Sequence, residues 1–242
     1  MEFMPERAPL VMLMLLGTCF LLGVAGLVTA YGLMRKRRDI AKKSLLAGAI
    51  VAGGYLVLLL GASLVSSEKV LAMGELKYFC EIDCHEAYSV AGVRTAKAIG
   101  EGPKQKTAAG TFYIVAVKVW FDEKTISSRR AKDMSLYPNP RKALLIDPRG
   151  QEFTVSPAGQ MALEKAEGKA AIPFTWLLKP GESYTTDLVF DVPSDVASPR
   201  LYITIADVLP APLLIGHERS PLHKHILFDL TPPPQPQTQG QL

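Results

Sequence analysis

The sequence contains few of the residues that most often carry catalysis or bind metals. Of its 242 residues, three are cysteine, four are histidine and two are tryptophan. It has no Gly-rich phosphate-binding loop and no regular alternation of strands and helices, which argues against a nucleotide-binding fold. The nucleophile motif Gly-x-Ser-x-Gly is also missing. We therefore expect no catalysis by this chain itself.

Charged residues are absent from two long stretches, residues 8–34 and residues 44–67. Each stretch exceeds the roughly 20 apolar residues that a helix needs to cross a hydrocarbon core of about 30 Å. We predict two membrane-spanning helices over these residues, so that residues 1–67 form a transmembrane helical hairpin. The lipid bilayer is then the first expected partner.

The strongest basic run lies between these two stretches, at residues 35–43, and reads Arg-Lys-Arg-Arg-Asp-Ile-Ala-Lys-Lys. Short loops rich in Lys and Arg stay on the cytoplasmic side. This predicts a bacterial inner (plasma) membrane protein with both termini and everything after residue 67 on the periplasmic or extracellular side. The net charge of +4 does not indicate nucleic-acid binding, because this membrane loop explains it.

The second apolar stretch also contains small residues at a spacing that permits close helix packing, namely Gly48, Ala49, Ala52 and Gly53. This face would join the chain's own two helices or dock a partner subunit. The sequence leaves both possibilities open.

After residue 67 the sequence is that of a β domain. Residues 112–121, 184–192 and 201–205 alternate apolar and polar side chains with the period of two that half-buried strands show. The turn at residues 147–150, Asp-Pro-Arg-Gly, predicts a hairpin, and residues 158–169 are the one plausible helix. We predict an all-β sandwich over residues 87–230, preceded by a juxtamembrane segment at residues 68–86.

These motifs resemble a known class of domain. The strand at residues 113–120, Ala-Leu-Leu-Ile-Asp-Pro-Arg-Gly at 143–150, Leu-Lys-Pro-Gly-Glu-Ser at 178–183 and Leu-Val-Phe-Asp-Val-Pro at 188–193 are similar to those of immunoglobulin-like extracytoplasmic domains of unknown function on bacterial membrane proteins and lipoproteins. The resemblance implies a fold and a location outside the cytoplasm. It implies no reaction, because such folds host unrelated functions.

The chain ends in a segment rich in Pro and Gln, residues 231–242. Such a composition cannot bury enough apolar surface to fold, so we predict a disordered tail.

The segment Cys80-Glu81-Ile82-Asp83-Cys84-His85 is the most specific chemical motif. Two cysteines four residues apart come close on a helical turn but not along an extended strand, so we predict a turn or short helix here. Three interpretations are open. The pair forms a disulfide, as an oxidising compartment favours; it binds copper or zinc together with His85; or it attaches haem c, whose usual motif is one residue shorter.

The other three histidines, His217, His223 and His225, lie close together near the end of the β domain. If a final strand ran to Leu230, His223 and His225 would share one exposed face and could chelate a metal with Cys80, Cys84 and His85. The arrangement resembles bacterial copper-handling proteins, such as oxidase assembly factors and copper-bearing oxidase subunits. It lacks the proline that follows the second cysteine in the assembly factors, and the downstream His and Met spacing of the oxidase subunits.

Two weaker features complete the candidates. The basic loop from Lys124 to Lys132 is interpreted as a solvated turn, with anionic headgroups or an acidic partner as the alternative. Trp120 and Trp176 are predicted to be core residues.

The sequence thus favours a membrane-anchored extracytoplasmic interaction protein, or an accessory subunit of a membrane complex, with a membrane or envelope protein as its partner. The alternative is a metal-handling or haem-binding redox protein that uses Cys80, Cys84, His85 and a distant histidine, His223 before His225. The alternative requires these side chains to converge in the folded domain.

Overall fold

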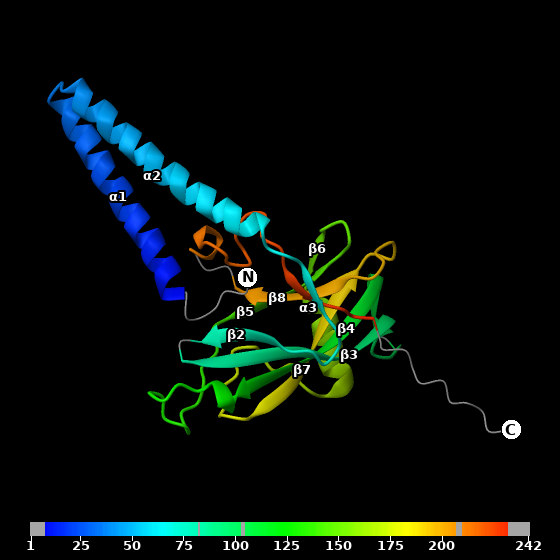
Figure 1. Ribbon diagram of the computed structural model, residues 1–242. Coiled ribbons are helices and arrows are strands. Elements are labelled where there is room, and N and C mark those ends of the chain that lie inside the picture. The colour runs from blue at the N-terminus through cyan, green and yellow to red at the C-terminus, as the bar shows by residue number, and fades with distance from the viewer. Residues whose placement is uncertain (1–7, 82, 103–104, 207–209, 232–242) are drawn as a thin grey trace. The chain divides into compact units, whose positions relative to one another are not determined.

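The computed structural model describes residues 8–81, 83–102, 105–206 and 210–231. The chain divides into two compact units. The helical unit contains the described residues up to Glu68 together with residues 210–225, and the sandwich unit contains residues 69–206 together with residues 226–231. Figure 1 shows the two long helices of the first unit and the strands of the second. Apart from Thr231, the predicted disordered tail lies outside the described residues.

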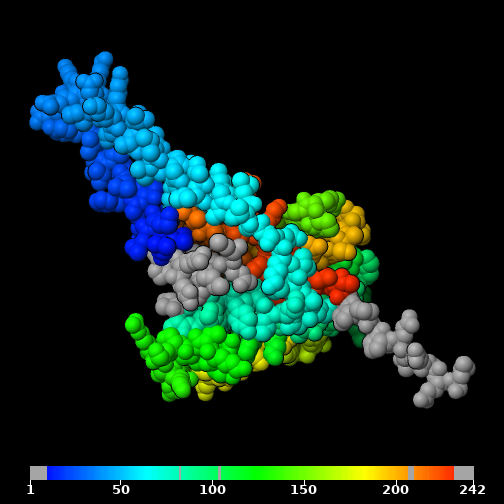
Figure 2. All heavy atoms as spheres, in the orientation of Figure 1, coloured from blue at the N-terminus to red at the C-terminus, as the bar shows by residue number. Residues whose placement is uncertain are grey.

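The helical unit begins with two long apolar helices, α1 (Ala8–Met34) and α2 (Arg38–Leu64), of 27 residues each. Both are long and apolar enough to cross a membrane, and only 6% of each apolar window is buried within the structure. The turn between them is shorter than the predicted basic loop, because Arg38 to Lys43 already belong to α2. In Figure 2 the side chains of this turn project from the closed end of the hairpin.

The small residues of α2 serve partly to pack the two helices together. A Cβ atom on Gly48 would lie 3.3 Å from the Cβ of Ala25 on α1, and the Ser44 hydroxyl donates to the Ala25 carbonyl at 2.8 Å. Gly53, by contrast, has open space around it. Gly48 therefore joins the chain's own helices, and Gly53 lies on a face that no described residue covers.

Two sheets form the sandwich unit. The five-stranded sheet has the order β1-β9-β8-β5-β6, and the four-stranded sheet has the order β2-β3-β4-β7. The strands are β1 (Lys69–Leu71), β2 (Lys77–Glu81), β3 (Cys84–Ile99), β4 (Lys106–Asp122), β5 (Arg141–Ile146), β6 (Glu152–Thr154), β7 (Ser183–Val192), β8 (Arg200–Ile205) and β9 (Ile226–Phe228). β1 pairs with β9 in parallel, and the other pairs are antiparallel. The hairpin predicted at residues 147–150 connects β5 to β6.

The alternation seen in the sequence places the core between the sheets. Val115, Val117 and Phe121 of β4 are fully buried against the five-stranded sheet, as the period of two predicts. The opposite face of β4 is also buried at Phe112 and Ile114, because α3 (Pro157–Glu167) packs there. α3 begins where the Ser156 hydroxyl accepts a hydrogen bond from the Gly159 amide, and it ends at Gly168 with φ 65°.

Two domain boundaries differ from the sequence-based prediction. The segment at residues 68–86 is not separate from the sandwich, because β1, β2 and the start of β3 pair with its other strands. Residues 210–225, predicted to belong to the sandwich, form part of the helical unit. Both differences arise from pairings between residues far apart in sequence, which local patterns do not encode.

Candidate functional site

The cysteine motif forms the tip of a β-hairpin. β2 ends at Glu81 and β3 begins at Cys84, with Cys80 paired to His85 and Glu81 paired to Cys84. The prediction of a turn or short helix is wrong for the two cysteines, which lie in strands, although Asp83 between them is in a turn. The reason is that β3 pairs on its other side with β4, as far as His85 opposite Asp122, and this pairing holds the start of β3 extended.

The hairpin separates the two cysteines onto opposite faces of the sheet. Directly paired residues share a face and successive residues alternate, so Cys80 and His85 lie together on the outer face while Cys84 faces the core. Cys84 is 2% exposed, and burial raises the pKa of its thiol to about 12. No disulfide joins Cys80 to Cys84 in this structure, and their opposite directions do not favour one.

The histidine segment does not form the predicted strand face. β9 begins only at Ile226, so His223 and His225 precede it. His217 is buried, and its Nδ1 accepts a hydrogen bond from the Arg219 amide at 3.1 Å. These three histidines belong to the helical unit, whereas Cys80, Cys84 and His85 belong to the sandwich unit.

Within the described part of the chain, no group of three or more His, Cys, Asp or Glu side chains is placed to hold a metal ion. Of the predicted ligands, the structure brings together Cys80 and His85 as a cross-strand pair. The copper, zinc and haem hypotheses stay predictions.

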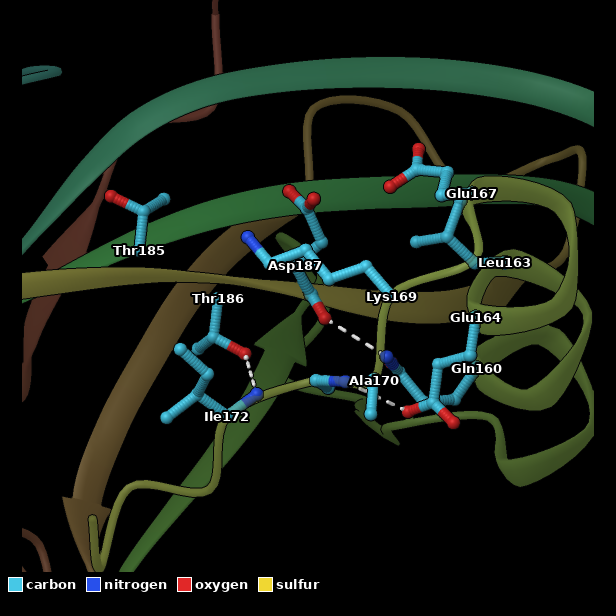
Figure 3. Close-up of a pocket in the computed structure, with 11 residues that line it drawn as sticks. Gln160, Leu163, Glu164, Glu167, Lys169, Ala170, Ile172, Thr185, Thr186 and Asp187 are labelled. Atoms are coloured by element: carbon cyan, nitrogen blue, oxygen red, sulfur yellow. Dashed lines mark hydrogen bonds between the residues drawn. The ribbon is translucent and has the colours of Figure 1, made fainter.

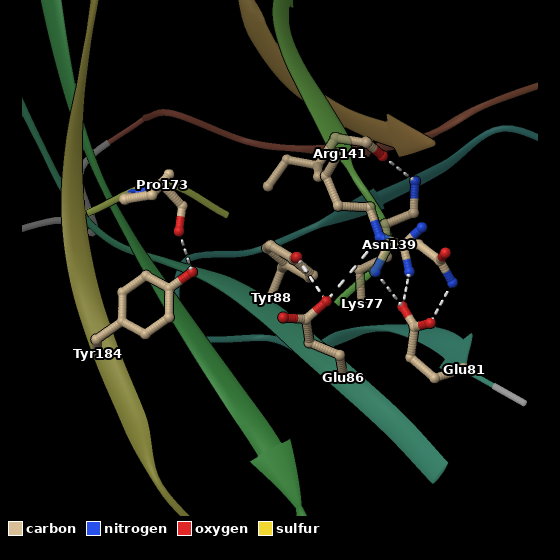
Figure 4. Close-up of polar contacts among 9 residues, drawn as sticks. Lys77, Glu81, Glu86, Tyr88, Asn139, Arg141, Pro173 and Tyr184 are labelled. Atoms are coloured by element: carbon tan, nitrogen blue, oxygen red, sulfur yellow. Dashed lines mark hydrogen bonds and ion pairs between the residues drawn. The ribbon is translucent and has the colours of Figure 1, made fainter. Parts of the chain in front are cut away.

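Sequence reasoning missed a cluster of charged residues between the two sheets, shown in Figure 4. Lys77 is 4% exposed and crosses from β2 to donate to the Ile203 carbonyl of β8 at 2.7 Å. The buried Glu81 carboxylate accepts hydrogen bonds from Asn139 and, at 2.5 Å, from Arg141 of β5. The sequence of β2 contains an indication of this cluster. Lys77 and Glu81 are each two residues from the buried Phe79, so on a strand they share its inward face.

Glu86 is the most deeply buried member of this cluster, with no solvent exposure. One carboxylate oxygen accepts from the Tyr88 hydroxyl at 2.7 Å and lies 4.0 Å from Arg141 Nε, while the other has no hydrogen-bond partner. Burial raises the pKa of Glu86 to about 7, although Tyr88 and Arg141 act to lower it. The cluster can therefore take up a proton near neutral pH inside the sandwich.

The sandwich unit also has a small polar pocket between α3 and β7, shown in Figure 3. Its volume is about 20 Å³, which is room for about one water molecule rather than an organic substrate. Hydrogen bonds from Gln160 to the Asp187 carbonyl and from the Ile172 amide to Thr186 tie its walls together. We interpret this pocket as a consequence of packing a helix against a sheet.

Four exposed apolar side chains lie on two loops that are joined to each other. Tyr137 is 80% exposed, Trp176 56%, Met134 53% and Leu177 39%. The loops are joined by a bridge in which Leu136 and Leu178 exchange hydrogen bonds of 2.7 and 3.3 Å. We call these four residues the aromatic loop surface. The prediction that Trp176 is a core residue is wrong, because it is Leu178 that turns inward here.

The loop from Lys124 to Lys132 is exposed at several basic side chains, and two contacts with Asp83 attach it to the β2–β3 hairpin. The Ser127 amide donates to the Asp83 carbonyl at 2.8 Å, and Arg130 forms an ion pair with the Asp83 carboxylate at 2.6 Å. Lys124, Arg129 and Lys132 are exposed. They give the loop a positive outer side that precedes the aromatic loop surface in the chain.

Comparison with known proteins finds likeness in solved structures alone. A secreted protein from Mycobacterium tuberculosis, MPT63, aligns with a TM-score of 0.40 and 13% identity over 69% of this chain and 99% of its own. A conserved hypothetical protein from Bacillus anthracis aligns with a TM-score of 0.38 and 15% identity over 53% of this chain and 86% of its own. An uncharacterized β-sandwich protein from Clostridium difficile aligns with a TM-score of 0.34 and 11% identity over 69% and 97%.

No family model matches the sequence, and no curated protein matches it.

Proposed function

We propose that this chain is a membrane-anchored interaction protein, or an accessory subunit of a membrane complex, without catalysis of its own. α1 and α2 cross the bacterial plasma membrane, and an immunoglobulin-like sandwich is displayed on the periplasmic or extracellular side. The partner is a membrane or envelope protein.

The helices support the anchoring part of this proposal. Most of their apolar side chains are exposed, for example Leu27 at 74% and Val57 at 70%, which water would strongly disfavour. The basic turn at residues 35–37 and the lysines of the first turns of α2 favour placing this end in the cytoplasm.

The aromatic loop surface is the single observation that carries the interaction part. Trp and Tyr are the residues most enriched at the energetic centres of protein interfaces. Here Tyr137 and Trp176 are exposed, as are two further apolar side chains, on two loops that a backbone bridge joins. The neighbouring exposed basic residues favour a partner that carries acidic groups at the rim of the contact.

Site-specific photo-crosslinking in cells tests this proposal. A benzophenone amino acid at Tyr137 is expected to capture one discrete protein, and the exposed Met161 of α3 provides a matched control position that captures none. The additional substitution Trp176→Ala is expected to remove most of the Tyr137 product. Equal capture from both positions, or a product insensitive to Trp176→Ala, would contradict a specific contact at this surface.

One observation supports the metal-handling alternative, namely the pairing of Cys80 with His85, whose buried Nδ1 has no hydrogen-bond partner. Metal analysis of the purified full chain separates it from the first proposal. If these residues bind metal, Cys80→Ser loses the metal and Cys84→Ser keeps it, because Cys84 faces the core. A full chain without stoichiometric metal or haem would eliminate the alternative.

A further inference from the structure

Residues 210–225 leave the sandwich between β8 and β9 and lie along the outer end of α2. In Figure 1 this orange segment runs beside the cyan end of the helix. The Tyr55 hydroxyl of α2 donates to the Leu213 carbonyl at 2.6 Å. Further along, the Lys224 amide donates to the Ser66 hydroxyl at 2.8 Å. The segment is therefore attached at two levels along the helix axis.

One face of α2 is buried near the point where this segment is attached. Tyr55, Leu59 and Ser63 are spaced four residues apart, which places them on a common face. Leu59 is 2% exposed and Ser63 is 1% exposed, whereas Val57 and Leu64 on other faces are 70% and 71% exposed. The outer part of α2 is thus covered on one side and open on the others.

The position of Tyr55 along α2 sets the depth of the segment, if α2 spans the bilayer as proposed above. The 27 residues of α2 extend about 40 Å, more than the roughly 30 Å of hydrocarbon. With Lys42 and Lys43 at the cytoplasmic boundary, about 20 residues of helix reach from Ser44 to the level of Ser63. Tyr55 lies about 12 Å below that level. The contact at Leu213 therefore falls within the outer leaflet.

The backbone of the segment is suited to such a position. Irregular backbone is tolerated at membrane depth only where its polar groups are paired. Pro210 and Pro212 have no amide hydrogen, and the amides of Leu213 and Leu214 donate to the carbonyls of Pro210 and Ala211 at 2.8 and 3.2 Å.

The carbonyls that follow are paired as well. The Leu213 carbonyl accepts the Tyr55 hydroxyl. The Leu214 carbonyl accepts the Ser220 hydroxyl at 2.5 Å and the His217 amide at 3.1 Å. These polar groups are therefore hydrogen-bonded within the segment or to α2. Such pairing is necessary in lipid, whereas in water the solvent could hydrogen-bond to them.

Apart from Lys224, the side chains that the segment leaves exposed are apolar. Leu213, in the 3₁₀ turn η3 (Ala211–Leu213), is 47% exposed, and Leu222 is 65% exposed. Lys224, which is also exposed, lies next to the Ser66 contact beyond the end of α2 and is placed to reach headgroups. This order of apolar tip and basic end is typical of elements that lie in the membrane interface.

We propose that residues 210–225 form a second membrane-contacting element, which inserts Leu213 and Leu222 among the phospholipids of the outer leaflet beside α2. The inference rests on the proposed membrane anchoring and extends it from the two helices to a segment near the other end of the chain. It also gives the histidine-containing segment a role that involves no metal.

Depth-dependent fluorescence quenching of the reconstituted full chain tests this inference. Trp120→Phe and Trp176→Phe remove both native tryptophans, and Leu213→Trp then introduces a single reporter. The vesicles contain phosphatidylcholine and phosphatidylglycerol with nitroxide groups on the acyl chains. Val57→Trp on the exposed face of α2 serves as the positive control, and Met161→Trp on the sandwich serves as the aqueous control.

The expected result is that the tryptophan at position 213 loses most of its emission, as the one at position 57 does, while the one at position 161 keeps its emission. If the tryptophan at position 57 is quenched and the one at position 213 is not, the inference is overturned, while the proposal that α2 spans the membrane is retained. If neither is quenched, membrane anchoring itself is overturned. Leu222→Trp repeats the test should Leu213→Trp disturb the contact with Tyr55, and quenching there supports the inference in the same way.

Discussion

Glu86 is a carboxyl group held between two sheets beside Arg141 and Tyr88, and its protonation is coupled to folding. Burial raises its pKa from 4.5 to about 7 in the folded protein. Below pH 4.5 both the folded and the unfolded states hold the proton. Between pH 4.5 and 7 only the folded state holds it, so the free energy of unfolding falls as the pH rises.

We therefore predict that ionisation of Glu86 lowers the free energy of unfolding by up to about 3 kcal/mol as the pH rises from 4.5 to 8. Glu86→Gln, which stays neutral and can still accept from Tyr88, should abolish this part of the pH dependence and be the more stable protein at pH 8. Denaturant unfolding of both proteins in detergent at several pH values provides the measurement. Parallel pH profiles for the two proteins would contradict the raised pKa.

The two hairpin cysteines provide a second prediction at the residue scale. Cys84 is buried and its thiol pKa is raised to about 12, so little reactive thiolate forms at neutral pH. In a Cys19→Ala, Cys80→Ser background, we expect Cys84 to remain unmodified by a maleimide until denaturant is added. In the matched Cys19→Ala, Cys84→Ser protein, we expect Cys80 to react in the folded state. Rapid labelling of Cys84 in the folded protein would show that the hairpin opens.

At the scale of elements, close approach of backbones constrains one glycine of β4. A Cβ atom on Gly110 would collide with the Val192 carbonyl and would lie 2.6 Å from the Ser194 amide nitrogen. Both are backbone atoms at the end of β7, which cannot move without breaking the pairing of β4 with β7. Gly92, in β3, has open space instead.

We predict that Gly110→Ala lowers the free energy of unfolding by about 1–3 kcal/mol through overpacking. Gly92→Ala should leave it unchanged or raise it by about 0.5–1 kcal/mol, because the unfolded chain loses flexibility. Denaturant unfolding of the two variants beside the parent protein is the measurement. Equal effects at both positions would mean that the backbone contact at Gly110 is absent in solution.

The elements differ in how far the sequence predicts them. The central strand β4 and its neighbour β7 were predictable, because apolar and polar residues alternate over most of their length. β2 was not predicted, since the side chains that it buries include Lys77 and Glu81. Those two charges are accommodated by Ile203 and Arg141 on the opposite sheet, which are far away in sequence.

At the scale of the whole molecule, the proposed topology places the turn between the helices in the cytoplasm and the sandwich outside. In a protein whose three native cysteines are replaced, a cysteine at Met161 should react with a membrane-impermeant maleimide added to intact cells. A cysteine at Lys36 should react only after the membrane is permeabilised. Labelling in the reverse order would show the opposite orientation, and labelling of both in intact cells would exclude a spanning hairpin.

The sequence alone determined the two long apolar helices and the β-sandwich, because apolar runs and alternation are local patterns that follow from burial. The tertiary structure alone decided three matters. It placed Cys80 and Cys84 on opposite faces, because the register of β2 against β3 sets which side chains point inward. It buried Glu86 beside Arg141 by stacking one sheet on the other. It attached residues 210–225 to α2 through Tyr55 and Ser66. A contact between segments far apart in sequence depends on the path of the chain between them, and the composition of either segment does not determine it.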